Sequence, residues 1–347
     1  MAALTRRLGA VAIAALVAGT MSSQAASEPL SFKGKTVNMI VAYAAGGGTD
    51  LTGRLLAPYL TKYLPGNPAV VVQNMPGGSG TRAMNYIVQR TAPDGLTVLM
   101  AAGSAVDPDL YRTLDVAYSP QNYNVIGGFG RGGLALLMRT AAEPRLRDAS
   151  QPPLSIGGVT AHDVFSRSGM ALFGVKYLGW NARWVVGYAG TNEIMLALDR
   201  GEVDMAVDGT VAKIRALVDS GRARILAQSS PRADFPGSPL FTDEMAGKIA
   251  DPVGQEAFAY WRDYNEMDKW LGLSPGTPDA IVAAYRTAFD RAAHDREFID
   301  QGKKVSEDFV VQPAATVSGL VQTLAATPPE AIDRIKQIAR EQGLEVK

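Results

Sequence analysis

The sequence predicts an α/β fold with mainly parallel sheets, a helical C-terminal region and two domains. Short apolar stretches typical of buried strands are followed by loops of small residues and then by helical patterns, and this order recurs in both halves of the chain. The chain has 347 residues, and the part after its apolar N-terminus is longer than a typical single domain.

The first of these units contains three consecutive glycines. An apolar run at residues 37–45 ends at the glycines 46–48, Thr49 and Asp50 follow, and residues 51–64 then place apolar side chains on one helical face. Glycine lets the backbone approach a ligand closely, and a helix N-terminus presents unpaired N–H groups and a partial positive charge. The loop therefore suits an anion.

The residues around these glycines narrow the choice of anion. A P-loop would place Lys-Ser or Lys-Thr after the glycines, and a dinucleotide loop would have G-x-G-x-x-G spacing; residues 46–50 have neither. A small carboxylate fits this pattern better. The alternative is a strand-to-helix turn without a ligand, in which Thr49 or Asp50 caps the helix.

Two further units of the same kind follow. Residues 69–73 and 96–102 are expected to be strands, and they lead into the small-residue loops 74–80 and 103–105. Ligands of parallel sheets bind beyond the carboxyl ends of the strands, which is where all three loops fall.

The chain changes character near residue 125. Residues 128–133 match G-x-G-x-x-G, but residues 134–138 after them resemble a strand and not a helix. We therefore expect a crossing between domains here, followed by a polar linker. A second α/β unit then has expected strands at 154–156, 182–186 and 203–207, each ending in a small-residue loop.

The last third of the chain is expected to be helical. Thr277-Pro278-Asp279 and residues 327–330 are strong helix starts, with proline in the first turn, and Gly343 is expected to end the last helix.

The N-terminus has the features of a secretory signal peptide. Arg6 and Arg7 precede the apolar residues 8–19, and Ser23-Gln24-Ala25 supplies small residues for cleavage near Ala25. The alternative is an uncleaved anchor. The chain contains no cysteine, which excludes disulfides and thiolate metal sites and fits a bacterial periplasm.

The charge balance excludes some partners. The chain carries 34 basic and 34 acidic residues, so we expect neither nucleic acid nor an anionic membrane surface as a partner.

Candidate catalytic residues are few. His162-Asp163 lies beside Ser166 and Ser168, but a catalytic triad is assembled from separate segments, and the sequence has no G-x-S-x-G elbow. We expect no enzymatic activity, cofactor or metal; an exported hydrolase is the alternative.

Several motifs taken in order resemble one known family. Residues 41–50 resemble its first-strand motif ending in Gly-Gly-x-Thr/Ser-Asp, and residues 72–80 its Val-x-Asn-x-Pro-Gly-x-x-Gly loop. Residues 93–97, 198–204 and 274–278 resemble its Pro-Asp-Gly turn, its Leu-x-Gly-Gln-Val-Asp stretch and its Pro-x-Gly-Thr-Pro helix start. The chain thus resembles the periplasmic solute-binding proteins of tripartite tricarboxylate transporters, the Bug or TctC-like family.

The resemblance implies a two-domain, type II-like Venus-flytrap fold that captures a small organic carboxylate and delivers it to membrane permease subunits. Domain 1 would comprise residues 30–130 with about 250–347, and domain 2 residues 131–249. A monomer in the periplasm is expected. The ligand-binding residues implied by position are Tyr43, Ala45, Gly46, Gly47, Thr49, Asp50, Ser79, Ser104 and Ala105 in the first domain, and Thr160, Tyr188, Ala189, Gly190 and Asp208 in the second.

The sequence also departs from the family pattern. Residues 187–190 are Gly-Tyr-Ala-Gly instead of Pro-Tyr-Lys-Gly, the loop 157–161 lacks its usual serines, and residues 241–270 are rich in aromatics. These changes favour a cleft that differs from one for a simple C4 or C5 dicarboxylate, so a dicarboxylate, a tricarboxylate and an aromatic acid all stay open. A ligand-binding component of a signalling system is a further alternative. We expect Asp50 to cap the helix, order a water or pair with Arg54 at i+4, because it would repel a carboxylate.

Overall fold

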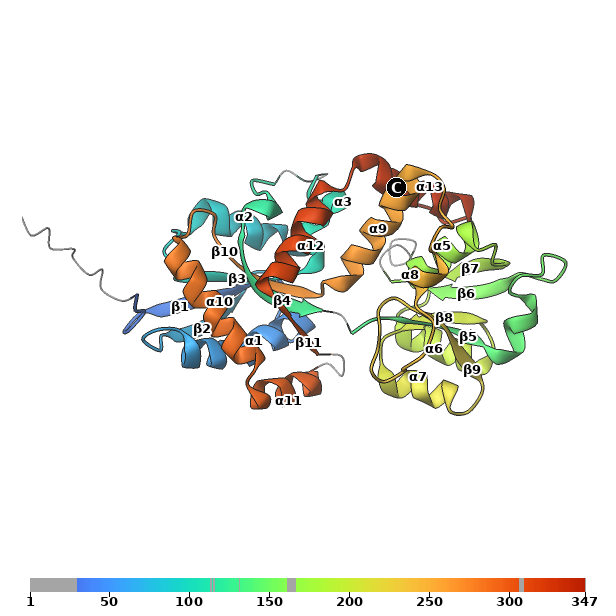
Figure 1. Ribbon diagram of the computed structural model, residues 1–347, viewed down its shortest axis with the longest axis horizontal. Helices are drawn as coiled ribbons and strands as arrows, with labels where there is room; N and C mark the ends of the chain where they lie inside the picture. The colour runs from blue at the N-terminus through green and yellow to red at the C-terminus, as the bar shows by residue number, and fades with distance from the viewer. Residues whose placement is uncertain are drawn as a thin grey trace, which may run out of the picture. The chain divides into compact units, whose positions relative to one another are not determined.

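The computed structural model describes residues 30–112, 114, 116–130, 132–160, 167–305 and 309–346. The predicted signal peptide, with Arg6, Arg7 and Ala25, lies outside the described residues, as do His162, Asp163 and Ser166. Residues 31–347 form one unit by their contacts, and Figure 1 shows strands and helices alternating along it. No helix in the described ranges is long and apolar enough to cross a bilayer.

The first sheet has six strands in the order β11-β4-β10-β3-β1-β2. β1 is parallel to β2 and β3, as the sequence predicts, whereas β10 is antiparallel to β3 and β4, and β11 is antiparallel to β4. The strands are β1 (Thr36–Val41), β2 (Ala69–Asn74), β3 (Thr97–Ala102), β4 (Asn124–Gly130), β10 (Lys269–Leu273) and β11 (Val310–Pro313).

Helices cover both faces of this sheet (Figure 1). α1 packs against α10 and α11 and approaches the sheet closely at Gly53, where an added Cβ would lie 3.1 Å from Val41 Cγ2. The other face buries Trp270 with apolar residues of α2 and α12. These helices are α1 (Gly48–Tyr63), α2 (Thr81–Arg90), α10 (Asp279–Ala293), α11 (Arg296–Val305) and α12 (Ala314–Ala326).

The second sheet has five strands in the order β7-β6-β8-β5-β9. β6 is parallel to β7 and β8, and β5 is antiparallel to β8 and β9. Its strands are β5 (Ala135–Arg139), β6 (Leu154–Gly158), β7 (Ala182–Val186), β8 (Met205–Asp208) and β9 (Ala223–Gln228), and its helices are α5 (Gly169–Tyr177), α6 (Thr191–Arg200) and α7 (Val211–Val218).

Both sheets are mixed, where the sequence predicted mainly parallel ones. The parallel pairs are those joined by strand-loop-helix units. β5 and β10 each follow a crossing of the chain from one sheet to the other. Each enters its sheet from the end opposite to that of its neighbours β8 and β3, so it pairs with them in antiparallel fashion.

The C-terminal helices divide their packing between the two sheets. α12 packs on β4 of the first sheet, whereas α13 (Pro329–Glu341) buries Ile335 and Ile338 in the apolar core that includes Leu136 and Ile156 of the second. α9 (Pro252–Glu266) precedes β10 and contacts both of these helices. The domain boundaries remain a prediction.

The remaining elements are short. They are α3 (Pro108–Tyr111), α8 (Phe241–Glu244), and the 3-10 turns η1 (Gly78–Gly80), η2 (Gly103–Val106), η3 (Pro120–Asn122) and η4 (Thr140–Arg145).

Candidate functional site

The glycine loop between β1 and α1 is organised by a buried carboxylate. Asp50 is 2% exposed. Its Oδ2 accepts hydrogen bonds from the Gly46 N–H at 2.8 Å and from Arg54 Nε at 3.0 Å, and its Oδ1 accepts one from Asn74 Nδ2 at 2.8 Å. The predicted i+4 pairing of Asp50 with Arg54 is confirmed. Asp50 therefore fixes the loop from within.

The hydrogen bonds at Asp50 also set its protonation state. Burial alone would raise the pKa of this carboxyl, but the hydrogen bonds from Arg54, Gly46 and Asn74 outweigh that effect and lower its pKa below the ordinary value. Asp50 is thus a carboxylate at neutral pH, and it already occupies the Gly46 N–H that the sequence offered to a ligand.

Three loops meet at Tyr43. The Tyr43 hydroxyl donates to the Ser79 carbonyl oxygen at 2.8 Å and lies 2.6 Å from Ser104 Oγ. Asn74 Nδ2 donates to the Tyr43 carbonyl oxygen at 2.9 Å. The predicted residues Tyr43, Ser79 and Ser104 are therefore joined at the carboxyl ends of β1, β2 and β3. Ala105 is buried beside them and its carbonyl accepts from Tyr118 Oη.

The first turn of α1 faces the same edge of the sheet. Its N-cap is Gly47, which has no side chain to accept a hydrogen bond from the first-turn N–H groups, and these groups have no carbonyl partner inside a helix. Ala45, Gly46 and Gly47 are exposed, whereas Thr49 is buried. The loop thus exposes backbone at a helix N-terminus, the geometry that the glycines predict.

A lysine that sequence reasoning missed lies against this loop. Lys269 begins β10 and is the register partner of Ala102 and Phe129. A Cβ built on Gly48 would lie 3.7 Å from Lys269 Cε and 3.9 Å from its Nζ. The Lys269 side chain is 13% exposed and forms an ion pair with Asp268. No motif marks this residue, because only the antiparallel return of β10 brings it to the carboxyl ends of β1 and β3.

The predicted residues of the second sheet lie at its corresponding edge. Tyr188, Ala189 and Gly190 form the loop between β7 and α6. The Ala189 N–H donates to Glu193 Oε2 at 3.0 Å, as the Gly46 N–H does to Asp50. In both loops the third helical residue accepts from the residue before the N-cap. Glu193, however, is exposed, so its carboxylate is free to turn away.

Asp208 ends β8 beside that loop. It is 2% exposed; its Oδ1 accepts from the Thr210 N–H at 2.6 Å, and its Oδ2 lies 3.4 Å from Lys213 Nζ. Lys213 also donates to Asn192 Oδ1 at 2.6 Å, so it joins the first turns of α6 and α7. Thr160, which is exposed, follows β6 at the same edge. The sequence did not indicate Lys213.

The crossing from β4 to β5 is held by a buried arginine. Arg232 is 5% exposed; it donates to the Gly133 carbonyl and, at 2.8 Å, to the Gly209 carbonyl. The Leu134 N–H donates to Ser229 Oγ at 2.8 Å. Arg232 thus fixes the start of β5 to the end of β8. Sequence reasoning missed it because its partners are backbone carbonyls, which carry no residue signature.

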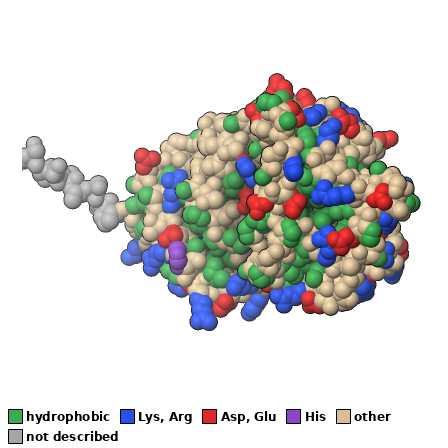
Figure 2. Space-filling view, turned by 45° about the vertical axis from the view of Figure 1, so that its right-hand side comes forward, with side chains coloured by type: hydrophobic (Ala, Val, Ile, Leu, Met, Phe, Trp, Pro, Cys, Tyr) green, Lys and Arg blue, Asp and Glu red, His purple; other side chains and the backbone are tan. Residues whose placement is uncertain are grey.

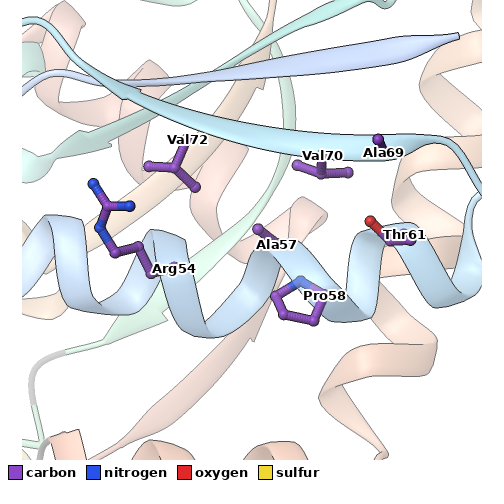
Figure 3. Close-up of a pocket in the computed structure, with 7 residues that line it drawn as sticks. All are labelled: Arg54, Ala57, Pro58, Thr61, Ala69, Val70 and Val72. Atoms are coloured by element: carbon purple, nitrogen blue, oxygen red, sulfur yellow. The ribbon is translucent and has the colours of Figure 1, made fainter.

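The structure therefore gathers the predicted residues into two groups, one at each sheet. Whether both groups contact one ligand remains a prediction. Four of the surface cavities lined by described residues lie elsewhere, and one of about 610 Å³ is lined by residues of α1 and β2, including Arg54, Ala57 and Val72. Figure 3 shows these side chains between the helix and the strand. None of the predicted ligand-binding residues lines any of these four cavities.

The charged side chains show no large surface of one sign on the face drawn in Figure 2, where acidic and basic groups are interspersed with hydrophobic ones. Among the described residues, no group of three or more His, Cys, Asp or Glu side chains is placed to hold a metal ion.

Comparison with known proteins identifies relatives of the chain. No protein-family model matches it. A UPF0065 protein in the gbd 5′ region of Cupriavidus necator is 39% identical over 93 residues, which is 27% of either chain. A UPF0065 protein in the TAR-I ttuE–ttuC′ intergenic region of Agrobacterium vitis is 25% identical over 346 residues, covering 95% of this chain and 91% of that one. Protein BugT of Bordetella pertussis is 34% identical over 102 residues, 29% of either chain.

Solved structures share the fold. A TctC solute-binding protein from Polaromonas superposes with a TM-score of 0.68 at 19% identity, covering 86% of this chain and 98% of that one. An R. palustris protein with adipate superposes with a TM-score of 0.53 at 19% identity, covering 89% and 97%. The fold is that of the two-domain periplasmic binding proteins, and the chain is similar in sequence to UPF0065 and Bug proteins and in structure to a TctC solute-binding protein.

Proposed function

We propose that the chain captures a small organic carboxylate in the periplasm and delivers it unchanged to the membrane permease subunits of a tripartite tricarboxylate transporter. The similarity to UPF0065 proteins and to a TctC solute-binding protein supports this role, and adipate, the compound solved with the R. palustris protein of the same fold, is a dicarboxylate. The proposed ligand lies between the loops at the carboxyl edges of the two sheets.

One observation carries this proposal. Tyr43, Ser79 and Ser104 join three loops at one sheet edge, next to an α1 first turn that its N-cap leaves uncapped. The Tyr43 hydroxyl holds these loops together, and the backbone N–H groups of the adjoining first turn are pre-organised donors for a carboxylate, because they need little ordering when the ligand arrives.

Neutral donors are sufficient for useful affinity. A hydrogen bond to a charged group contributes about 1.5–3 kcal/mol, and micromolar binding requires about 8 kcal/mol. Roughly four such bonds reach that value. If each sheet supplies part of this set, only the closed arrangement completes it, and closure then follows from binding.

The two loops differ in how easily they open to a ligand. Asp50 is buried and held by Arg54 and Asn74, so it stays in the first loop. Glu193 is exposed and bonds Ala189 from the same helix. A ligand carboxylate would take the place of the Glu193 carboxylate at the Ala189 N–H, which explains how one loop is preformed and the other adjusts.

The proposal is tested by recovering the ligand. The purified protein is incubated with succinate, adipate, citrate and benzoate, separated from free acid, and examined by native mass spectrometry and then after denaturation. We expect one unmodified acid per chain. Recovery of a converted product in catalytic amounts would contradict a binding role and support the hydrolase alternative.

A further inference from the structure

We propose that Lys269 is the residue that selects an anionic ligand in this site. The inference rests on the proposed function and adds to it the source of positive charge. The glycine loop and the first turn of α1 supply neutral backbone donors, which would also bind neutral polar molecules; a fixed cation beside them favours a carboxylate over its uncharged analogue.

The position of Lys269 is set by topology. β10 runs antiparallel to β3, so its first residue lies at the edge where β1 and β3 end. The Gly103 N–H, which starts the third loop, donates to the Asp268 carbonyl at 2.9 Å. Lys269 therefore stands between the first loop and the third, next to the start of α1.

The surroundings of Lys269 are electrostatically unusual. Its Nζ lies 3.9 Å from the position that a Cβ would take on Gly48, the first residue of α1. A helix N-terminus carries partial positive charge and favours anions, so a lysine with a side chain only 13% exposed is unfavourable there unless a negative group lies nearby. The acid of the first turn, Asp50, is turned toward Gly46 and Arg54.

Asp268 supplies the negative charge in the structure as it stands. Asp268 directly precedes Lys269 in the chain, and its carboxylate forms an ion pair with the Lys269 ammonium group. The Asp268 side chain is 29% exposed. A ligand carboxylate placed over the first turn of α1 would meet both the helix N-terminus and Lys269. Asp268 would then oppose the ligand through like charge, while Lys269 attracts it.

This arrangement predicts opposite effects for two neighbouring substitutions. Lys269→Met keeps an unbranched side chain of nearly the same length and removes its charge, and we expect the dissociation constant of an acid to rise roughly 10- to 100-fold. Asp268→Asn removes the competing negative charge, and we expect the dissociation constant to fall by about tenfold. A merely structural ion pair would give weaker binding, or no change, in both variants.

The control is Lys62, which also forms an ion pair but lies at the other end of α1, away from the glycine loop. Lys62 lies in the last turn of α1, and its Nζ is 2.8 Å from Asp295 Oδ2. Lys62→Met removes one positive charge and one ion pair, so it matches Lys269→Met in both respects. We expect it to leave the dissociation constant unchanged. Lys269→Arg, which keeps the charge, should bind within a fewfold of the original protein.

The experiment is isothermal titration with succinate, adipate, citrate and benzoate and with the amide of each. The original protein should bind at least one acid more tightly than its amide, and Lys269→Met should reduce that preference. If Lys269→Met binds the acid as tightly as the original protein, or Asp268→Asn binds it more weakly, the inference is overturned and the proposed function stands. If the original protein binds none of the acids, the proposed function itself fails.

Discussion

At the scale of single residues, the two acids Asp50 and Glu193 show how one interaction can have two roles. Each follows an N-cap glycine by three residues and accepts the N–H of the residue before that glycine. Asp50 is buried and has three donors, including Arg54 and Asn74, whereas Glu193 is exposed. The same bond is therefore a fixed support in the first loop and a removable contact in the second.

Asp50 should make stability depend on pH in the acid range. Its pKa is lowered in the folded protein, so its contribution to the free energy of unfolding is complete above the unfolded value, near pH 4, and is lost as the pH falls through the folded value. Urea unfolding between pH 3 and 7 should show this loss. Asp50→Asn should lower the free energy of unfolding at pH 7 by about 1–3 kcal/mol and by a smaller amount at pH 3. Equal destabilisation at both pH values would contradict this account.

Tyr43 should affect affinity more than stability. Tyr43→Phe removes the hydroxyl that bonds Ser79 and Ser104, so Ser104 loses its orientation, and we expect acids to bind about 5- to 10-fold more weakly. The matched control is Tyr63→Phe, which removes a hydroxyl bonded to Asp295 at the other end of α1. Comparable loss of stability in both variants, with loss of affinity only at Tyr43, is the expected result in titration and urea unfolding. Unchanged affinity in Tyr43→Phe would remove this residue from the site.

At the scale of elements, α1 is fixed to its sheet along one face and exposed at its first turn. Both features depend on glycine. Gly53 permits close packing on Val41 and Met39. Gly46 has a φ of 80° in the left-handed region and turns the chain into the loop. Gly47, in contrast, has a φ of −77° and a ψ of 165°, which any residue adopts.

Gly47→Val should therefore separate binding from folding. Its Cβ would meet the Ala44 carbonyl oxygen at 3.4 Å, an ordinary contact, so the free energy of unfolding should change by less than about 1 kcal/mol. The side chain would cover the first-turn N–H groups, and we expect acids no longer to raise the melting temperature.

The matched control for Gly47→Val is Gly53→Leu in the same helix. It should destabilise the protein by about 1–3 kcal/mol through overpacking against β1 and β3. Urea unfolding with and without ligand distinguishes the two. A large loss of stability in Gly47→Val would support the alternative that the glycines form only a turn.

The elements also show which parts of the fold were predictable. The strand-loop-helix units at residues 36–63, 69–90 and 182–200 have strong local patterns, and each is present in the structure. β10 and β11 were not placed by the sequence, because their partners are distant along the chain and the direction of a strand leaves no local pattern. Lys269 was missed for that reason. The contacts of Asp50 and Arg54 were predictable from their i+4 spacing, whereas those of Arg232 with backbone carbonyls were not.

At the scale of the whole molecule, the chain passes repeatedly between its two sheets. α12 packs on the first sheet, and the next helix, α13, completes the core of the second. Lys336 of α13 donates to Asp109 at 2.8 Å, and Arg112 donates to the Thr327 carbonyl at 2.7 Å. The end of the chain therefore joins segments that are distant in sequence, and a ligand that moves one sheet relative to the other must act through these connections.

Two buried residues should reveal this division. Ile338→Ala on α13 and Leu324→Ala on α12 remove fully buried side chains and should each cost about 2–5 kcal/mol. Native-state hydrogen exchange should show faster exchange mainly in β5, β6 and β8 for Ile338→Ala, and mainly in β1, β3 and β4 for Leu324→Ala. Loss of protection in the first sheet for Ile338→Ala would contradict the packing of α13 on the second sheet. It would favour the predicted division, in which residues from about 250 to 347 all belong to domain 1.

The central claim is that the chain holds an organic carboxylate between loops built of small residues, and thermal unfolding in the presence of ligands tests it most directly. The protein is heated with succinate, adipate, citrate and benzoate, with the amide of each, and with a sugar and a polyamine. An acid present at about 100 times its dissociation constant should stabilise the folded state by about 2.7 kcal/mol, and its amide should have a smaller effect. Stabilisation by the sugar or the polyamine, with none by any acid, would contradict the account.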